Sequence, residues 1–226
     1  ATPDHPRGVA PTWGAPHANG APMADAQLRD ELLTMILAGH ETTALTLTYA
    51  VWQLAEHPAL QEELHDEIDA VLGDRPCTTA DLGSLAAVRA TVSESNRLFP
   101  PAWAVSRENR IPFELGGVAM PSDTQFVASP WVTQRDPRWW NDPLAFRPER
   151  WRNGETDGLP RFAYFPFGGG PRVCIGNHFA TMEAQLLLAT FLQRYRVTAD
   201  EGFEPSFFAA VTVRPRNGVW VHVHRR

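Results

Sequence analysis

The sequence predicts a mainly α-helical fold with small β-sheets, which is the α+β class. Residues 25–56 contain no proline and are dominated by apolar side chains from Leu32 onward, as in a long helix. Leucine and isoleucine then recur every four residues from Leu60 to Leu72, which is the spacing of one helix face. Near the C-terminus, valines alternate with other residues in two short runs, which is the spacing of a strand. Long helices and short strands together predict the mixed class.

The N-terminal third is expected to hold a loop and two helices. Residues 1–22 contain five prolines and three glycines, so we expect a loop or disordered tail there and take residues 23–226 as the folded portion. Asp25 is the expected N-cap of the first helix, which ends at Glu56 because a proline follows closely. The second helix opens at Pro58 and ends at Gly73.

The remaining two thirds are expected to alternate helices, short strands and coil. A third helix is predicted over residues 85–98, and short strands between Phe113 and Gln134 with a Gly-Gly turn. Residues 135–173 lack periodicity, and a coil of that length is commonly functional. A last helix covers residues 176–195, and an Asn-Gly turn then joins a C-terminal hairpin. The apolar face predicted for that last helix comprises Phe179, Met182, Leu186, Leu187 and Phe191.

Composition excludes some classes of function. The net charge is −6, whereas a nucleic-acid-binding surface would be basic. Cys77 and Cys174 are too few for a disulfide framework, so we expect a reducing, cytoplasmic location. No signal peptide is visible, and a membrane anchor preceding this chain stays open. The apolar run from Leu32 to Ala55 is long enough to span a bilayer, but Glu41 lies at its centre, where a carboxylate is costly, so a buried helix is favoured over a spanning one.

The ten residues from Phe167 to Gly176 are the most informative segment. A lone cysteine is usually a small buried hydrophobe. Here, three consecutive glycines let the backbone pass close to a flat ligand, and Cys174 stands just before an expected helix, whose free N–H groups favour a thiolate. Arg172 can pair with a carboxylate on the same ligand. The segment therefore predicts a loop that presents an anionic sulfur.

A polar segment from Ala38 to Thr43 interrupts the apolar part of the first helix. One reading is a patch where the helix meets solvent. Gly39, however, costs about 1 kcal/mol in a helix interior, which suggests that room is needed there. The Thr42 hydroxyl can bond the carbonyl of Ala38 and open the helix, with Glu41 as a titratable group beside it. These residues predict a small-ligand pocket.

Glu94 and Arg97 place opposite charges three residues apart on the third helix. By themselves they predict an exposed ion pair worth about 0.3 kcal/mol. The helical wheel agrees, because the apolar side chains of this helix, Val88 and Val92 among them, lie on a different face.

Taken together, these segments resemble the cytochrome P450 family. Phe167-Gly-Gly-Gly-Pro-Arg-Val-Cys-Ile-Gly176 fills every fixed position of the family's haem-ligand signature, Phe-x-x-Gly-x-Arg-x-Cys-x-Gly. The segment around Glu41 resembles the oxygen-binding groove, Glu94-Ser-Asn-Arg97 the Glu-x-x-Arg motif, and Pro-Glu-Arg150-Trp the Pro-Glu-Arg-aromatic segment. All four occur in family order.

The resemblance, which covers about residues 23–226, implies the C-terminal portion of a P450 fold that holds haem b (iron protoporphyrin IX) on Cys174. It implies proton delivery by Thr42 and Glu41, and a structural triad of Glu94, Arg97 and Arg150 that replaces the exposed pair. Haem contacts are implied for Ala38, Arg107, Phe167, Gly168, Arg172 and Gly176.

The implied activity is that of a haem-thiolate monooxygenase, which inserts one oxygen atom of O2 into a small hydrophobic organic substrate. Electrons would come from a redox protein or reductase domain, and no nucleic acid is involved. The segments implied to line the substrate pocket contain Ala102, Trp103, Ala104, Val105, Ala209 and Ala210.

Two departures from the family pattern stand out. Gln134 replaces the His often seen before Arg-Asp-Pro, and we expect this change to be neutral. The family's N-terminal half is absent from this sequence. Three alternatives therefore stay open: a non-catalytic truncated fragment, a haem-thiolate binding module that needs Cys174 but not Thr42, and a membrane-anchored interaction protein.

Overall fold

The computed structural model describes residues 23–226, so the expectation for residues 1–22 lies outside the described part of the chain. Two units are distinguished, with their boundary between Glu41 and Thr42, and each is considered by itself. Helix α2 (Asp25–Glu56) has the predicted end, but Asp25 is its first helical residue and not the N-cap. Within the described residues, no helix combines the length and the apolar character that crossing a membrane requires.

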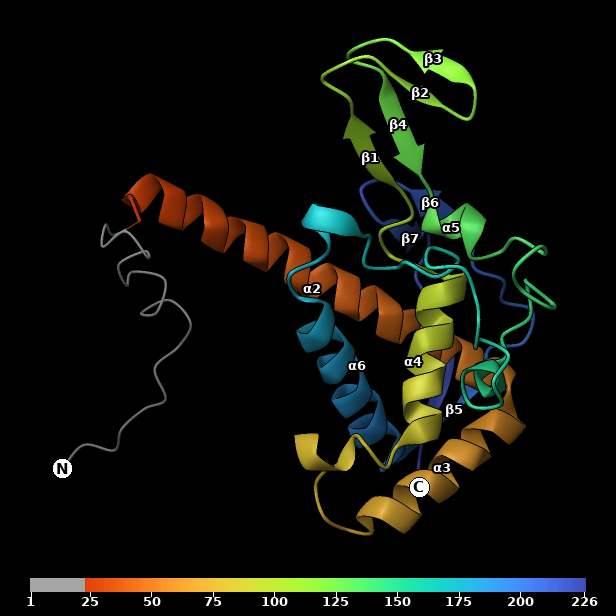
Figure 1. Ribbon diagram of the computed structural model, residues 1–226. Coiled ribbons are helices and arrows are strands. Elements are labelled where there is room, and N and C mark those ends of the chain that lie inside the picture. The colour runs from red at the N-terminus through yellow and green to blue at the C-terminus, as the bar shows by residue number, and fades with distance from the viewer. Residues whose placement is uncertain (1–22) are drawn as a thin grey trace. The chain divides into compact units, whose positions relative to one another are not determined.

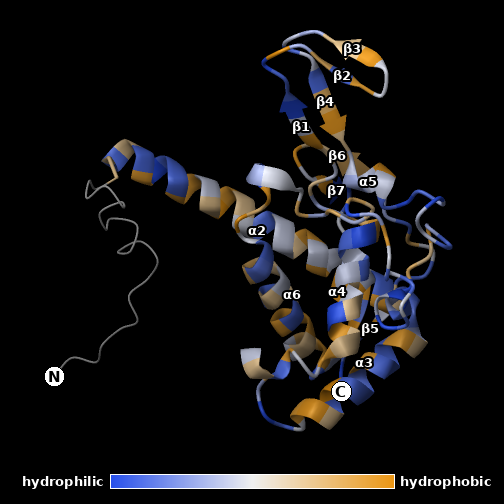
Figure 2. Ribbon diagram, viewed as in Figure 1, coloured by the Kyte–Doolittle hydropathy of each residue, from blue (hydrophilic) through white to orange (hydrophobic). Residues whose placement is uncertain are grey.

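The helices of the second unit enclose its main core. Helices α3 (Pro58–Leu72), α4 (Ala86–Leu98) and α6 (Asn177–Leu192) contact one another, as Figure 1 shows. Three members of the predicted apolar stripe of α3 are buried, and the fourth, Leu60, is half-buried. Gly73 ends this helix with a φ of 54°. Apolar bands along α3 and α6 are visible in Figure 2. The central buried side chains are Leu54, Leu64, Ile68, Val88, Val92, Leu188, Leu192 and Val197.

The buried face of α6 differs from the predicted one. Ala184, Leu188 and Leu192 face the core, whereas Phe179 and Leu187 of the predicted face are exposed. Because α6 carries apolar residues on more than one side, spacing alone does not single out the stripe that packs against α3 and α4. The helix also ends at Leu192, three residues before the predicted boundary.

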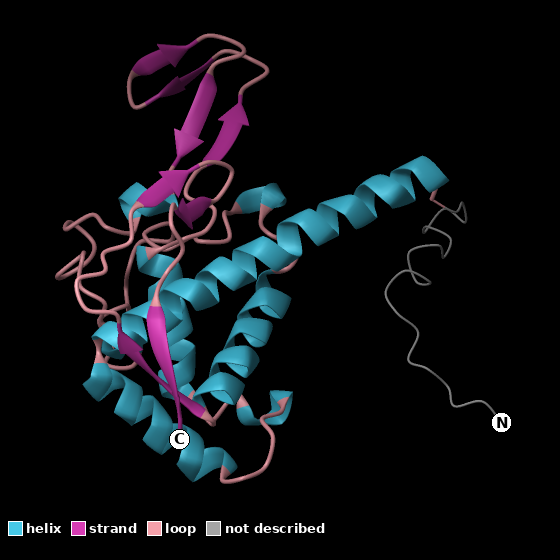
Figure 3. Ribbon diagram, turned by 180° about the vertical axis from the view of Figure 1, so that it is seen from behind, coloured by secondary structure: helices cyan, strands magenta, loops and turns pink. Residues whose placement is uncertain are grey.

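Within residues 23–226, strands pair into four small antiparallel sheets of two strands each, drawn in magenta in Figure 3. The pairs are β1 (Val105–Glu108) with β4 (Gln125–Ala128), β2 (Phe113–Leu115) with β3 (Val118–Met120), β5 (Tyr195–Ala199) with β8 (Val221–Arg225), and β6 (Phe207–Ala209) with β7 (Val213–Pro215). The Gly116-Gly117 turn between β2 and β3 is confirmed, since both glycines have positive φ. A short helix, α5 (Pro130–Thr133), takes the place of strand at the end of the predicted region.

The predicted C-terminal hairpin is wrong in its pairing. Gly218 does turn the chain, with a φ of 74°, but β7 and β8 do not form a ladder with each other. Each pairs instead with a strand that comes earlier in the chain, β7 with β6 and β8 with β5. The alternation of valines identified strands and not their partners, because partner choice depends on which strands the helices bring together.

An aromatic cluster joins α2, α4 and the β6–β7 sheet. The rings of Tyr49, Phe99 and Phe207 lie 5.1–5.9 Å apart, and the Tyr49 hydroxyl donates to the carbonyl of Val213 at 2.7 Å. Aromatic pairs at such distances are favourable beyond the area that they bury. The mainly helical architecture with small sheets is therefore the predicted α+β class, and these contacts hold the β6–β7 sheet beside α4.

Candidate functional site

The loop that carries Cys174 is closed by its own backbone. The N–H of Cys174 donates to the carbonyl of Phe167 at 3.0 Å, and a 3₁₀ turn, η3 (Gly170–Arg172), lies between them. Gly168 and Gly170 adopt φ values of 72° and 71°, which side-chain-bearing residues rarely adopt. Gly168 and Gly170 are therefore required by the backbone path, and the closed loop determines where the cysteine stands.

The thiol lies at the protein surface near a helix N-terminus. Cys174 is exposed and stands three residues before Asn177, where α6 begins. Gly176 leaves space beside the sulfur, since a Cβ there would lie 3.9 Å from Cys174 Sγ. Ile175 is 88% exposed and Phe179 is 62% exposed. Exposed apolar side chains that lie next to one another in this way are typical of a surface that another molecule covers.

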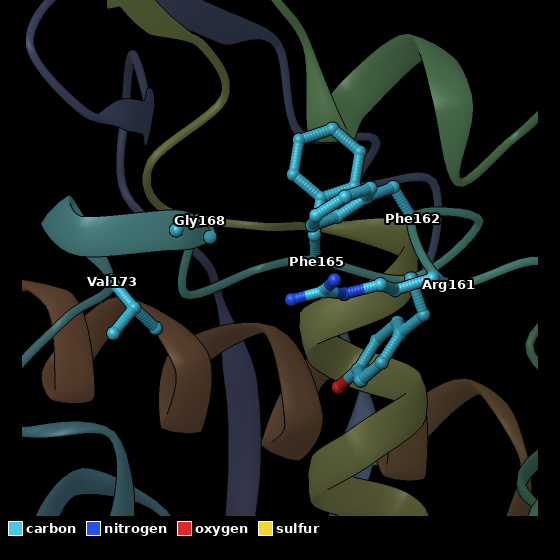
Figure 4. A pocket seen from close by; sticks show the side chains of 8 residues that line it. Arg161, Phe162, Phe165, Gly168 and Val173 are labelled. Carbon is cyan, nitrogen blue, oxygen red and sulfur yellow. The ribbon is translucent and has the colours of Figure 1, made fainter.

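A pocket of about 430 Å³ adjoins this loop. Figure 4 shows Gly168 and Val173 on one side of it and Arg161, Phe162 and Phe165 on the other. The loop and the Phe162 ring approach closely, because a Cβ added at Gly169 would lie 2.6 Å from Phe162 Cε1. The pocket thus depends on the absence of side chains from the glycine run.

Behind the loop, Glu94, Arg97 and Arg150 form a buried charge cluster, with side chains at most 1% exposed. The Glu94 carboxylate accepts two bonds from Arg97, at 2.8 and 2.9 Å, and one from Arg150 Nε at 3.1 Å. The carboxylate also accepts hydrogen bonds from Trp151 Nε1 at 2.8 Å and from the backbone N–H of Arg147 at 2.9 Å. A buried carboxylate with this many donors is fully compensated.

Arg97 connects the cluster to the coil of residues 135–173. Its three remaining N–H groups donate to the carbonyls of Gln134, Pro143 and Ala145, at 2.8–2.9 Å. All five donors of the guanidinium are therefore used. The helical wheel suggested an exposed pair because it takes no account of the coil, which covers the polar face of α4 and buries it.

Two members of this region were not identified as contributors from the sequence. From the sequence, Trp151 is only the aromatic residue of the Pro-Glu-Arg-aromatic segment, and Gln134 is only an expected neutral replacement of His. Trp151 bonds the cluster directly, and its ring lies 4.6 Å from that of Tyr164. Burial raises the pKa of Tyr164, whose hydroxyl donates to the carbonyl of Ser93. Gln134 is fully buried and Trp151 is half-buried, and a polar group that is removed from water needs a hydrogen-bond partner.

The two segments predicted to line a substrate pocket are brought together. Trp103 Nε1 donates to the carbonyl of Ala210 at 2.8 Å, and the N–H of Val213 donates to the carbonyl of Pro101 at 3.0 Å. Val105 also approaches the cysteine loop, because its Cγ1 would lie 3.9 Å from a Cβ at Gly168. The same two segments also contain the predicted pocket residues Ala102, Ala104, Ala209 and Ala210.

Arg107 and Arg172, predicted to contact a ligand carboxylate, are both exposed. Arg107 lies on β1 and donates to the carbonyl of its neighbour Ser106. The Arg172 side chain makes no hydrogen bond or ion pair with any residue in the described part of the chain. Both guanidinium groups are thus open to solvent, and their role stays a prediction.

The two residues predicted for proton delivery, Glu41 and Thr42, fall on either side of the boundary between the two units, and the predicted haem contact Ala38 lies before it. Ala38 and Glu41 belong to residues 1–41, and Thr42 to residues 42–226. Helix α2 is α-helical throughout and shows no break at Thr42, whose carbonyl accepts the Thr46 hydroxyl at 3.1 Å. The position of these side chains relative to Cys174 stays a prediction.

Comparisons with known proteins identify relatives. The sequence profile described as cytochrome P450 matches residues 15–221. Cyclooctatin synthase of Streptomyces melanosporofaciens is 42% identical over 178 residues, which are 79% of this chain and 39% of that protein. Putative cytochrome P450 132 of Mycobacterium bovis is 39% identical over 92% of this chain and 45% of its own length. Pentalenene oxygenase of Streptomyces avermitilis is 37% identical over 86% of this chain and 43% of its own length.

The chain spans less than half of the length of these relatives. The profile nevertheless covers most of the described residues, including α2, the buried Glu94 cluster and the cysteine loop. The chain belongs to the cytochrome P450 family.

Proposed function

We propose that this chain is the haem-binding portion of a haem-thiolate monooxygenase, with Cys174 as the ligand of the iron. The observation that carries the proposal is the exposed Cys174 thiol, held on a closed glycine-rich loop at the N-terminus of α6. Thiolate ligation of haem favours cleavage of the O–O bond. The activity, substrate and partners of the whole protein are part of the proposal.

The residues around the thiol fit a haem group. Sulfur is a soft donor suited to iron, and the α6 N-terminus favours its anionic form. The exposed Ile175 and Phe179 side chains provide an apolar surface, as a porphyrin ring would need. The exposed guanidinium groups of Arg107 and Arg172 suit the propionates. The family implies haem, and haem b is the form we propose.

When bound, haem supplies the activation of O2 and the oxidation of a C–H bond. The protein residues hold the haem, orient the substrate and supply protons. In this proposal, the Thr42 Oγ1 atom holds a water molecule by a hydrogen bond, and the Glu41 carboxylate passes protons to it from solvent.

The proposed substrate is a small hydrophobic organic molecule. The contact of the 101–105 segment with the 209–213 segment supports this, because the side chains there are mainly small and apolar. Pentalenene oxygenase among the relatives supports an oxygen-inserting reaction. O2 is the co-substrate, electrons come from a redox protein or reductase domain, and we propose a cytoplasmic location.

Spectroscopy tests the ligand assignment. The chain is loaded with haem, reduced and exposed to CO, and should show the red-shifted Soret band of thiolate ligation. Cys174→Ser should abolish this band, whereas the control Cys77→Ser should keep it, because Cys77 is half-buried against the helical core. A Cys174→Ser protein with the parent spectrum would overturn the proposal.

Proton delivery is tested by a pair of neighbouring threonines in a full-length version of the protein. Thr42→Ala should leave the CO spectrum intact but release peroxide at the expense of product, because the water at Oγ1 is lost. Thr43→Val is the control, since Thr43 Oγ1 is buried with no hydrogen-bond partner among the described residues. Equal coupling of electron consumption to product in Thr42→Ala and parent would contradict the role of Thr42.

A further inference from the structure

Gln134 makes three side-chain hydrogen bonds in a fully buried position. It follows α5 and is 0% exposed. Its Nε2 donates to the carbonyls of Asn96 and Arg97, both at 3.0 Å, in the last turn of α4. Its Oε1 accepts the N–H of Phe165 at 2.8 Å. The side chain thus joins the end of one helix to a segment 31 residues further along the chain.

These three backbone partners can be satisfied together by a carboxamide. Two of them are carbonyls, which only accept, and the third is an N–H, which only donates. A carboxamide has two N–H donors and an acceptor oxygen. An ionised Glu has no donor, a neutral His has one donor and one acceptor, and Leu has neither. The carbonyls at the end of α4 have no partner inside the helix, so the amide also acts as a tertiary cap.

Phe165 leads directly into the loop that carries Cys174. The carbonyl of Phe165 accepts the N–H of Gly168 at 2.9 Å, and the carbonyl of Phe167 accepts the N–H of Cys174 at 3.0 Å. Gln134 is also bonded to the charge cluster, since its own carbonyl accepts Arg97 Nη1 at 2.8 Å. A continuous series of hydrogen bonds therefore links the buried charges, through Gln134, to the start of the cysteine loop.

We propose that Gln134 is a positioning residue for the Cys174 loop. By holding Phe165 against the last turn of α4, its amide determines where the loop begins and hence where the thiol is presented. The inference rests on the proposed role of Cys174 as iron ligand, but the position of the loop can be measured without haem.

A second glutamine in the chain provides a matched control. Gln61 is also buried, at 2% exposed, and makes the same set of bonds. Its Nε2 donates to the carbonyls of Leu54 and Val197, and its Oε1 accepts the N–H of Val197 at 2.7 Å. It joins α2 and α3 to β5, and none of these three hydrogen bonds involves the cysteine loop. Gln61→Leu therefore removes an equivalent amide elsewhere in the fold.

The experiment is hydrogen exchange of the full chain, read in the peptide that covers residues 165–176. Gln134→Leu should accelerate exchange of the Gly168 and Cys174 N–H groups by about fivefold or more, the factor expected for the loss of one hydrogen bond. Gln61→Leu should accelerate exchange around Val197 and leave residues 165–176 unchanged. Gln134→His, which keeps one donor and one acceptor, should be intermediate, and it replaces Gln134→Leu as the test variant if the latter is insoluble.

Two results would overturn the inference: unchanged exchange at residues 165–176 in the Gln134 variants, or an equal increase there in Gln61→Leu. With haem added, the Gln134 variants should also show a smaller fraction of the red-shifted CO band than Gln61→Leu does. Failure of the parent chain to give that band would count against the proposed function alone, because the exchange comparison does not depend on haem.

Discussion

Replacing Glu94 with alanine removes the acceptor at the centre of the buried charge cluster. Five hydrogen bonds are lost, two from Arg97 and one each from Arg150, Trp151 and the backbone of Arg147. The two guanidinium groups stay buried, since the coil that covers them is held by other bonds of Arg97. Glu94→Ala therefore leaves Arg97 buried without its counter-ion beside Arg150, which retains an ion pair with Glu155 at 3.6 Å.

The expected cost follows from these contacts. An uncompensated buried charge costs about 3–5 kcal/mol. The N–H groups of Trp151 and Arg147 add about 1 kcal/mol or more if either stays unsatisfied. The free energy of unfolding should therefore fall by at least about 3 kcal/mol, a large part of the 5–15 kcal/mol that is typical of a domain.

Urea-induced unfolding, followed by tryptophan fluorescence, measures this loss, because Trp140 and Trp151 lie beside the cluster. Glu63→Ala is the matched control. It breaks an ion pair with Arg152 at the surface, which should contribute less than about 1 kcal/mol. If Glu94→Ala and Glu63→Ala shift the unfolding midpoint equally, the argument that the cluster is a buried, compensated unit is refuted.

Two further predictions concern helices α3 and α4. Glu67 of α3 caps α4, because its carboxylate accepts hydrogen bonds from the backbone N–H groups of Ala87 and Val88. Glu67→Ala should therefore lower the free energy of unfolding by about 1–2 kcal/mol in urea titrations, whereas the control Asp66→Ala should have little effect. Burial lowers the pKa of His65 below 6.5, so the unfolded chain takes up the proton more readily than the folded one. The contribution of His65 to stability should therefore be full above pH 6.5 and fall as the pH drops toward the folded-state pKa. His65→Leu should flatten that dependence in unfolding curves recorded from about pH 5 to 8.

The helices were predictable because their signals are local. The four-residue spacing of Leu64 and Ile68 and the glycine at position 73 depend only on neighbours in the chain, and α3 has the predicted bounds. The face of α6 was not predictable in the same way. Phe179 and Leu188 are both apolar, and only contact with α3 and α4 distinguishes the buried side from the exposed one.

The candidate functional site likewise has features that the sequence predicts and features that it does not. The positive φ of Gly168 and Gly170 and the position of Cys174 before a helix follow from residue types in one short segment. The role of Gln134 does not, because its partners in α4 and at Phe165 lie more than 30 residues away in either direction. A buried amide is recognised only when its surroundings are known.

By itself, the sequence determined where the long helices lie, the bounds of α3, the glycine-dependent turn of the cysteine loop and membership of the P450 family, since each depends on residue identity at fixed spacing. Tertiary structure alone decided which strands pair, which face of α6 is buried and why Glu94 is not exposed. The physical reason is that burial and hydrogen-bond partners are properties of segments that meet in space. Residues 135–173 cover the polar face of α4 although no local pattern in either segment requires it.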